Sequence, residues 1–443
     1  MIRNLMIRLY LASPRFVVVS WRGIKSVVRA IKAFFVQTKI DRTVLRLRRH
    51  VCGPISVGFY VVSDTCFQLE TVFQMMMRGG DFIPKVVVVP NMTLGEAERA
   101  SVYTTTFTRL SDKYPGMVID ARGGAGEYED VSSQFDIIAT MNPYDALTLK
   151  IYGIEYLAEK GIPVLLSRYY QEDGTVWGDH LNRLPELSFL WRFYQGNEQV
   201  MHDTARHQRL LAKRRRLVVV GEPKIDRLKE KVECHCPRKR IILAPHHSIV
   251  PIGDVGLQLS NFVKYASFIM GLPQKYPEID WIFRPHPLLM PTMVSRCFWT
   301  EAERSAWLDR FVSFPNVNYM TEGDYYDAFL NSDGMIQDCG SFLPEYFYVG
   351  KPQCYVLKSK EHELQQFTDY GRSLLDHVYR AYCEEDIVSF IENVVLAGKD
   401  PMKESRENFT ENTIKYNYPH ASEAVLEDIR KALGIEHVTE GVK

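Results

Sequence analysis

Two short segments, about fifty residues apart, join an apolar run to side chains that bind charge or move protons. Residues 281–287 read WIFRPHP, and residues 338–346 read DCGSFLPEY. Each has the form of a strand that ends in polar residues, and ligands of open α/β sheets bind beyond the carboxyl ends of the strands. An arginine, a histidine, a serine and a glutamate on one rim suit a diphosphate. The sequence therefore predicts a diphosphate site in this half of the chain.

Arg284 and His286 each precede a proline in the first segment. Proline holds the residue before it in an extended conformation, so both side chains should project from a rigid turn. A guanidinium presents a planar fork to phosphate oxygens, and a histidine donates to phosphate or transfers a proton. We predict that Arg284 binds substrate and that His286 is catalytic. A buried ion pair is the structural alternative for Arg284.

The second segment predicts a helix over 341–349 with polar groups at its start. Free backbone N–H groups and the positive end of the helix dipole favour an anion at Ser341, which also fits an ordinary N-cap. Glu345, one turn later, shares the face of Ser341. We predict substrate-binding roles for Asp338, Ser341, Glu345 and Lys351. The alternative for Lys351 is that it only ends the helix favourably.

Two adjacent histidines, His246 and His247, follow an apolar run at 240–244. Histidines at a strand end serve as general base, phosphate donor or metal ligand. We predict that one of them is the catalytic base; the alternative is a histidine that satisfies loop carbonyl groups. Lys224 follows the apolar run 217–220, and we predict that it binds substrate unless it lies in a plain turn.

The cysteines give no sign of a metal centre or a disulfide scaffold. Eight are scattered along the chain, and the one suggestive pair, Cys234-His235-Cys236, has no partner pair at zinc-site spacing. We predict no metal and no cofactor, and we interpret the charged segment around Pro237 as a linker.

Apolar runs alternate with helical stretches over most of the chain, which predicts parallel sheets with right-handed crossovers. The predicted strands are 55–62, 85–90, 116–119, 135–140, 162–167 and 217–220, then 240–244, 280–283, 317–319, 334–337 and 353–357. The predicted helices are 67–77, 93–114, 145–159, 261–275, 300–311, 325–331 and 341–349. The expected fold class is α/β, with two doubly wound, nucleotide-fold-like domains that face a cleft, where a ligand binds preferentially.

The N-terminal segment is strongly basic, although the formal net charge of the 443 residues is zero. Residues 1–50 hold twelve Lys or Arg and one acid, Asp41. Apolar residues recur at helical spacing at Ile24, Val27, Val28, Ile31, Phe34 and Phe35. The polar side holds Lys25, Arg29 and Lys32. Such an amphipathic helix suits an anionic membrane surface; the alternative is a helix packed on the domain with a solvated basic face.

The sequence also argues against several classes of protein. No apolar run reaches the roughly 18 residues of a membrane-spanning helix, and Arg3, Arg8 and Arg15 interrupt any signal-peptide core. Basic runs at 213–216 and 238–240 lack interleaved aromatic residues, so a nucleic-acid partner is not expected. We predict a cytoplasmic protein, peripheral on the inner face of the cell membrane.

The chain resembles the CDP-glycerol glycerophosphotransferases of teichoic-acid and capsule synthesis. The resemblance runs over about residues 55–420 and rests on segments in matching order and spacing: 221–226 (GEPKID), 244–248 (APHHS), 283–287 (FRPHP), and 338–346 with 350–352 (GKP). It implies a GT-B-like fold of two Rossmann-like domains. It further implies Arg284, His286 and Ser341 around the donor diphosphate, with Glu345 near the glycerol or ribose hydroxyls.

One motif of that family has no match here. Its better-studied polymerases carry Trp-His-Gly in the first domain, whereas the comparable region of this chain holds Ser167-Arg168-Tyr169-Tyr170 and later His180. The resemblance therefore does not identify the catalytic base, for which we retain His246 or His247.

The resemblance implies transfer of glycerol phosphate from CDP-glycerol, or of a related polyol phosphate, to a hydroxyl of a lipid-linked polymer, with CMP as the leaving group. The expected partners are this donor, that acceptor and an anionic membrane surface. The expected domains are a membrane-associating segment (1–50), an acceptor domain (51–226), a linker (227–240), a nucleotide-donor domain (241–400) and a helical tail (401–443).

Two other functions stay open. The nearer is a GT-B glycosyltransferase that uses a sugar nucleotide in cell-surface polysaccharide synthesis. The other is a non-catalytic protein that binds an envelope polymer, against which the clustered Arg, His, Ser and Glu speak.

Overall fold

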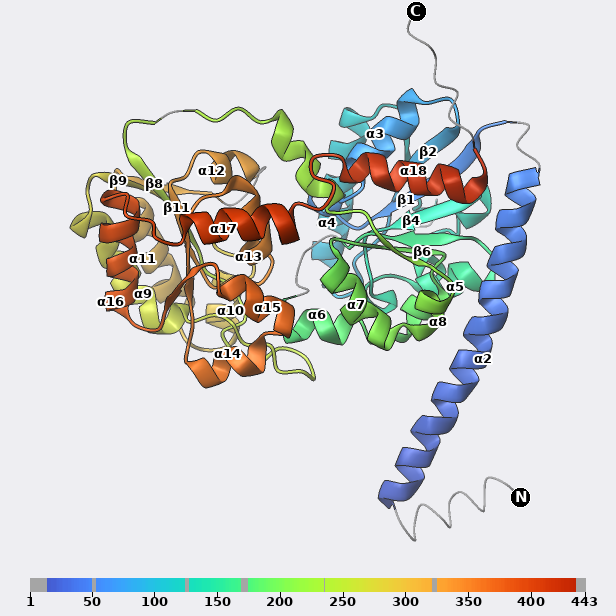
Figure 1. Ribbon diagram of the computed structural model, residues 1–443, viewed down its shortest axis with the longest axis horizontal. Helices are drawn as coiled ribbons and strands as arrows, with labels where there is room; N and C mark the ends of the chain where they lie inside the picture. Colours follow the sequence, from blue (N-terminus) through green and yellow to red (C-terminus); the bar gives the residue numbers. More distant parts are fainter. Residues whose placement is uncertain are drawn as a thin grey trace, which may run out of the picture.

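The computed structural model describes residues 14–49, 53–123, 127–168, 174–234, 236–320 and 325–435, and within 14–26 it describes only the helical backbone. Two α/β domains lie side by side, and the long helix α2 (Pro14–Arg49) runs along the edge of the first (Figure 1). The Cys-His-Cys segment includes His235, which lies outside the described residues, as do Tyr169 and Tyr170.

The first domain is built on a parallel sheet of seven strands in the order β3-β2-β1-β4-β5-β6-β7. Their bounds are β1 Ile55–Val61, β2 Phe82–Val88, β3 Val118–Asp120, β4 Ile137–Thr140, β5 Val164–Leu166, β6 Arg192–Gln195 and β7 Leu217–Val219. β4 and β5 are buried at every position, and β1 at all but one. Runs that are apolar on both faces are typical of parallel strands covered by helices on each side.

The second domain is built on a parallel sheet of six strands in the order β10-β9-β8-β11-β12-β13. Their bounds are β8 Lys239–Ala244, β9 Ile279–Phe283, β10 Val317–Tyr319, β11 Gly334–Gln337, β12 Gln353–Val356 and β13 Tyr379–Ala381. The first strand, β8, pairs with β9 on one side and with β11 on the other. The strand order therefore reverses at β8, and the loops after β8, β9 and β11 leave the sheet next to one another, where such folds bind ligands.

Helices cover both sheets. In the first domain they are α2, α3 Glu70–Arg78, α4 Glu96–Lys113, α5 Ile154–Glu159, α6 Val176–Leu181, α7 Glu198–His207 and α8 Arg209–Lys213, with shorter turns η1 Asp64–Cys66, η2 Ser132–Gln134, η3 Asp145–Leu147, η4 Lys150–Tyr152, η5 Pro185–Phe189 and η6 Pro223–Glu230. From the second domain onward they are α9 Phe262–Lys275, α10 Leu289–Ser295, α11 Glu301–Val312, α12 Tyr326–Leu330, α13 Phe342–Glu345, η7 Tyr346–Val349, α14 Lys360–Gln366, α15 Asp369–Leu375, α16 Glu384–Ser389, η8 Phe390–Leu396, α17 Lys403–Phe409, η9 Thr410–Ile414 and α18 Ala421–Leu433.

One predicted helix is wrong over most of its length. Residues 145–159 form two short turns, η3 and η4, before α5 begins. The reason is a side-chain cap: the Asp145 carboxylate accepts the backbone N–H groups of Ile154 and Glu155 at 2.6 and 3.0 Å. A helix that continued through this point would supply those acceptors from its own backbone, so the cap marks a true helix start.

The C-terminal helix α18 crosses back to the first domain (Figure 1). Its apolar side enters the first-domain core through Val425, Leu426, Ile429, Ala432 and Leu433. The buried Asp226 carboxylate caps it by accepting from the backbone N–H groups of Ala421 and Ser422, at 3.2 and 2.6 Å. The segment 401–435 therefore divides between the two domains, because α17 and η9 pack on the second.

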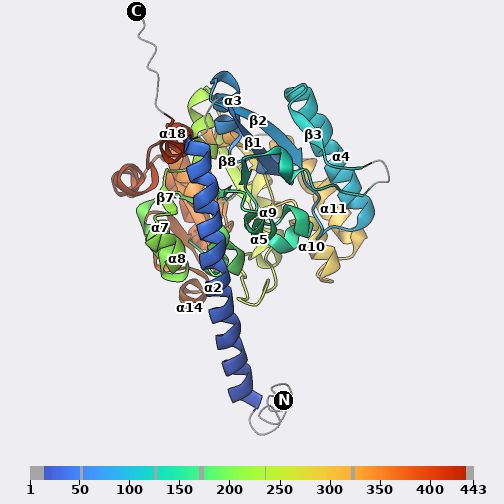
Figure 2. The same cartoon turned by 90° about the vertical axis from the view of Figure 1, so that its right-hand side faces the viewer.

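Helix α2 packs on the first domain along its C-terminal half and projects beyond the body of the molecule along its N-terminal half (Figures 1 and 2). It buries Ala33, Val36, Ile40 and Val44 in the core. Arg29 and Lys32 form ion pairs with Glu155 of α5. The apolar side faces the other way, with Val27, Val28, Ile31, Phe34 and Phe35 each between 52% and 67% exposed.

The alternative expected for α2 was a packed helix with its basic face in solvent. The structure shows the opposite orientation. The paired basic side chains of α2 point toward the domain, and its apolar stripe is the free side. Among the described residues, no helix combines the length and the apolar character needed to cross a membrane.

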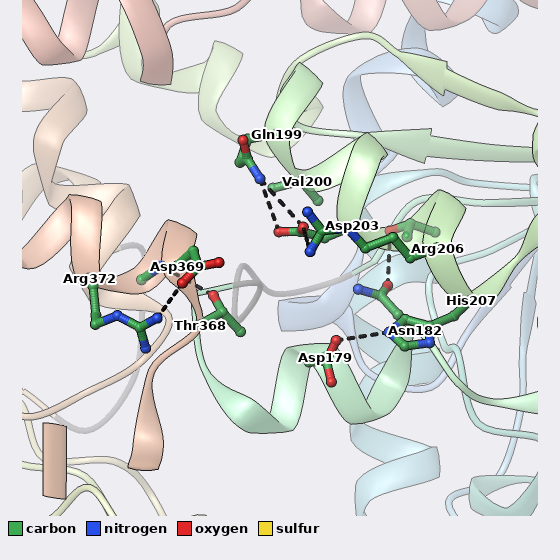
Figure 3. A network of polar contacts seen from close by, with 12 residues as sticks. Asp179, Asn182, Gln199, Val200, Asp203, Arg206, His207, Thr368, Asp369 and Arg372 are labelled. Carbon is green, nitrogen blue, oxygen red and sulfur yellow. Dashed lines mark hydrogen bonds and ion pairs between the residues drawn. The ribbon is translucent and has the colours of Figure 1, made fainter. Parts of the chain in front are cut away.

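The two domains touch below the cleft, through α6 and α7 on one side and α15 on the other. The backbone N–H of Thr368 donates to the Gly174 carbonyl at 2.9 Å, and Asn197 donates to the Tyr370 hydroxyl at 3.0 Å. Figure 3 shows the polar residues around this contact. The pairs Asp179 with His207 and Asp369 with Arg372 each join two residues of the same domain. The domains are thus linked through both backbone and side chains, and Val200 of α7 packs in one apolar cluster with residues of the second domain.

Candidate functional site

A cavity of about 190 Å³ lies between the domains, at the carboxyl ends of both sheets. From the first domain it is lined by Thr65, Cys66 and Lys224. From the second it is lined by Ala244, Pro245, Arg284, Pro285, His286, Pro287, Tyr325, Cys339, Ser341, Phe342 and Glu345. The two segments 281–287 and 338–346 therefore meet at one wall of an interdomain cavity, and Lys224 faces them.

The loop after β9 is fixed against the loop after β8. Arg284 N–H donates to the Leu243 carbonyl at 2.8 Å, and His286 N–H donates to the Pro245 carbonyl at 2.9 Å. The guanidinium of Arg284 donates to the Met320 carbonyl at 3.0 Å. Among the described residues no carboxylate is paired with it. Burial lowers the pKa of Arg284, which means that its charge is partly desolvated and favours an anionic ligand.

His286 is held as a hydrogen-bond donor toward the cavity. Its Nδ1 accepts the backbone N–H of Leu288 at 3.1 Å, so the proton of the neutral ring lies on Nε2. Burial, with His247 and Arg284 nearby, lowers its pKa to about 3. The ring is therefore neutral near pH 7 and presents an N–H group, which suits a phosphate oxygen better than it suits removal of a proton.

The three histidines stack on one another, and His286 alone of the three lines the cavity. Rings of His247 and His286 lie 4.0 Å apart at 27°, and the His246 ring is 4.3 Å from His247 and 4.9 Å from His286. One ring nitrogen of each lies within 4.8 Å of the others, a spacing near that of a metal site. However, a histidine ligand aims its lone pair in the ring plane, and two nearly parallel rings cannot aim at one ion. This arrangement favours hydrogen bonding over metal ligation.

The structure does not place His246 or His247 at the cavity, which corrects the prediction that one of them acts directly on substrate. His246 is 2% exposed, and its Nδ1 is bonded to the Ser248 hydroxyl at 2.7 Å. Burial lowers the pKa of His246 well below its ordinary value and that of His247 to about 4, so both rings stay neutral. The strand-end signal located the loop correctly, but His246 is buried and the half-buried His247 stacks on His286, and neither ring lines the cavity.

Asp338 also lies behind the site. Its carboxylate accepts the backbone N–H groups of His246 at 2.6 Å and Asn261 at 2.7 Å, and burial raises its pKa to about 7. It does not line the cavity; it fixes the loop that carries the histidines. The predicted substrate contact of Asp338 is therefore replaced by a positioning role.

Ser341 lines the cavity, but not as the start of a long helix. The predicted helix over 341–349 is one turn of α-helix, α13, followed by the tighter turn η7. Ser341 makes no side-chain cap, and its hydroxyl lies 3.3 Å from Cys339 Sγ. Ser341 thus stands at the N-cap position of α13 without a capping hydrogen bond, which leaves its hydroxyl placed for a ligand.

Lys351 lies away from the cavity. Its ammonium pairs with Glu233 at 2.8 Å and bonds to the carbonyl of Leu330. It ties α12 to the segment between the domains, so its predicted contact with substrate is not supported and the structural alternative fits.

Lys224 and Glu345 are joined across the cavity through a residue that the sequence did not single out. The Lys224 ammonium donates to the Tyr325 hydroxyl at 2.7 Å, and that hydroxyl donates to Glu345 Oε2 at 2.5 Å. The turn that delivers Lys224 begins at Gly221, whose φ of +89° requires glycine. Glu345 is 3% exposed, and its carboxylate at the cavity already accepts the hydrogen bond from Tyr325.

Three lining residues were missed by the sequence analysis: Thr65, Cys66 and Tyr325. Thr65 and Cys66 follow β1, and Tyr325 follows β10, so the rule of strand ends applies to them as well.

In the region comparable to the family's Trp-His-Gly motif, Arg168 is 8% exposed and donates to Asn182 at 2.5 Å. His180 lies on α6, near Trp177. Neither lines the cavity.

Comparisons with known proteins give similarity in fold only. No family model matches the chain, and no curated protein matches it in sequence. The solved wall teichoic acid polymerase TagF aligns over 94% of this chain and 98% of its own, with a TM-score of 0.55 and 12% identity. The UDP-GlcNAc 2-epimerase from Neisseria meningitidis bound to UDP-GlcNAc aligns over 85% of this chain and 100% of its own, with a TM-score of 0.53 and 13% identity. The predicted fold class, two Rossmann-like domains in a GT-B arrangement, is confirmed.

Proposed function

We propose that this protein transfers glycerol phosphate from CDP-glycerol, or a related polyol phosphate from the corresponding CDP-polyol, to a hydroxyl of a membrane-linked teichoic-acid or capsule-type polymer. The observation that carries this proposal is the interdomain cavity in which Arg284, His286 and Ser341 face Lys224. Three donors from one domain and a cation from the other provide the charge and geometry that a diphosphate needs. Each of the four sequence segments that resemble this transferase family contributes at least one residue to the cavity lining.

The reaction is an in-line substitution at phosphorus. The acceptor oxygen attacks the phosphorus that carries glycerol, the bond from that phosphorus to the bridging oxygen breaks, and CMP leaves. In a loose phosphoryl-transfer transition state most of the catalysis is positioning and charge neutralisation. Arg284 and the Nε2–H of His286 bind the phosphate oxygens, and the hydroxyl proton is lost late, to water. No strong base is required from His246 or His247.

A second candidate is a GT-B glycosyltransferase that uses a sugar nucleotide. The observation in its favour is that an epimerase of the same fold binds UDP-GlcNAc. The same cationic wall would hold a UDP-sugar diphosphate, so only the choice of donor separates the two candidates.

Donor specificity is the deciding measurement. The purified protein, with membranes as acceptor, is incubated with CDP-glycerol, CDP-ribitol and UDP-sugars, and release of CMP or UDP is followed. We expect CMP from a CDP-polyol. Arg284→Ala and His286→Ala should each lower the rate about 100-fold or more, because each removes a donor to the charged transition state.

The matched control is Arg296→Ala, at an exposed position just after α10. It should retain the rate of the wild-type protein, and circular dichroism should show all variants folded. UDP release from a sugar nucleotide would favour the second candidate, and full activity in both site variants would place the site elsewhere.

We also propose that α2 holds the enzyme at an anionic membrane surface. The five exposed apolar side chains of its free side form the kind of patch that marks an interaction surface. The sequence from residue 1 to residue 40 contains eight Lys or Arg, Arg29 and Lys32 included, and no acid. An apolar stripe next to a basic, acid-free segment matches the acyl boundary and the headgroups of an anionic bilayer.

A further inference from the structure

The contact from Lys224 through Tyr325 to Glu345, here called the relay, joins the two domains across the cavity. Its protons can be assigned. A carboxylate only accepts hydrogen bonds, so the single phenolic proton of Tyr325 is given to Glu345, at 2.5 Å. The phenol oxygen must then accept from Lys224, at 2.7 Å. Lys224 is left with two further N–H groups for another acceptor.

The relay is buried on the side of the second domain and open on the side of the cavity. Tyr325 is partly buried, and this burial together with the Glu345 charge raises its pKa well above the ordinary value, so the phenol stays neutral. The Lys224 ammonium lies 5.0 Å from the centroid of the Tyr325 ring, a cation–π contact that adds to the hydrogen bond. The charged end of Lys224 is therefore held at a defined place on the cavity wall.

Arg284 lies close enough to Tyr325 for the two to interact electrostatically. Two cations from opposite domains thus border the same phenol and the same cavity. A ligand with two linked phosphates can contact both at once, whereas neither domain alone supplies both.

We propose that Tyr325 is a positioning residue for the donor: through it, Glu345 orients the Lys224 ammonium of the first domain toward a nucleoside diphosphate that Arg284 and His286 bind from the second. This inference rests on the proposed function for the identity of the donor. It gives Glu345 a role through Tyr325 in place of a direct contact with glycerol or ribose hydroxyls.

The test is the binding of CDP and UDP to the full-length protein by calorimetry. Tyr325→Phe keeps the ring and removes the hydroxyl, and Lys224→Met keeps the chain length and removes the charge. Each should weaken CDP binding about ten-fold, the usual effect of losing one hydrogen bond to a charged group. The double variant should be no weaker than the poorer single variant by more than about two-fold, because both changes break one contact.

The matched control is Tyr346→Phe. Tyr346 is buried in the same apolar cluster and bonds to the Ser332 hydroxyl at 2.7 Å, but it does not line the cavity. It should lower the melting temperature much as Tyr325→Phe does and leave CDP affinity unchanged. Unchanged affinity in Tyr325→Phe, or losses that simply add in the double variant, would overturn the inference.

The two proposals fail in different ways. If the wild-type protein binds CDP with the expected variant effects but releases no CMP from CDP-glycerol or CDP-ribitol, the relay stands and the proposed reaction is wrong. If CMP is released but the relay variants bind as the wild type does, the reaction stands and the relay is wrong. If neither CDP nor UDP binds the wild-type protein, both are wrong.

Discussion

At the scale of single residues, the site consists of charged groups placed where burial alters their protonation. Arg284 and Lys224 border the cavity as cations, while the three histidines behind and beside them stay neutral. A stack of three protonated rings would repel itself and the arginine. Keeping the rings neutral leaves the positive charge on the two groups that face the ligand and lets His286 act as an N–H donor.

The neutral histidines predict a loss of stability in acid. In the unfolded chain a histidine binds a proton as the pH falls below its ordinary pKa of 6.5, whereas folded His247 does so only near 4 and folded His286 near 3. The unfolded state therefore binds more protons between pH 6.5 and 4, and the free energy of unfolding should fall on acidification. The slope is about 1.4 kcal/mol per pH unit for each fully shifted histidine.

Urea unfolding at several pH values measures this effect. Between pH 6.5 and 4, the free energy of unfolding of His247→Gln should fall by about 1–3 kcal/mol less than that of the wild type, because one titrating group is gone. Asp338 acts in the opposite sense, since its pKa is raised to about 7, but it contributes equally to both proteins. His420→Gln, at an exposed position, is the control. Parallel curves for wild type and His247→Gln would contradict the prediction.

At the scale of elements, three neighbouring strands build one wall of the site and the long helix α2 builds a separate surface. The motifs after β8, β9 and β11 converge because these strands are adjacent in the sheet, although they are distant in sequence. Helix α2 is attached to the first domain by its buried side and by the ion pairs of Arg29 and Lys32 with Glu155, while Phe34 and Phe35 stay more than half exposed.

The free side of α2 predicts flotation with vesicles. The full-length protein should float with vesicles of phosphatidylglycerol and phosphatidylcholine, and less with phosphatidylcholine alone. The double variant Phe34→Ser and Phe35→Ser should bind about 100-fold more weakly, since each phenylalanine contributes roughly 1.5–3 kcal/mol on burial.

The control for this experiment is Val232→Ser with Leu364→Ser, two exposed apolar side chains far from α2. It should float as the wild type does. A wild-type protein that stays in the aqueous fraction, or a phenylalanine variant that floats normally, would rule out the proposed surface.

At the scale of the whole molecule, the cavity depends on how the two domains are placed against each other, because both contribute to its lining. Their contact below the cleft includes two facing glycines, Gly174 and Gly371. A Cβ atom added at Gly371 would lie 1.8 Å from the Gly174 carbonyl oxygen. The absence of a side chain thus sets how closely α15 approaches the first domain at this contact.

Gly371→Ala should therefore push the domains apart. We expect overpacking to lower the free energy of unfolding by about 1–3 kcal/mol, which lowers the melting temperature. We also expect a larger radius of gyration in small-angle scattering. Gly271→Ala, in α9 with no atom within 4 Å of the added Cβ, is the matched control and should stabilise slightly. If both variants behave alike, the glycine contact does not set the interdomain distance.

The sequence by itself was enough for the architecture of both domains. Eleven of the strands were predicted, because long apolar runs with helices between them are typical of parallel sheets. β6, with Arg192 and Gln195 at its ends, and the short edge strand β13 were missed, since neither forms an apolar run. The sequence also found the loops that carry Arg284, His286, Ser341, Glu345 and Lys224, because polar residues directly after apolar strands stand out locally.

Only the tertiary structure decided which residues of those loops reach the cavity. His246, Asp338 and Lys351 have the same local signals as Arg284 and Ser341, but burial against neighbouring loops gives them other partners. Tyr325 became part of the site through Lys224, which is about a hundred residues away in the chain. Hydrophobic pattern and strand ends are properties of short stretches of sequence, whereas the direction of a side chain depends on packing between segments that meet only in the folded protein.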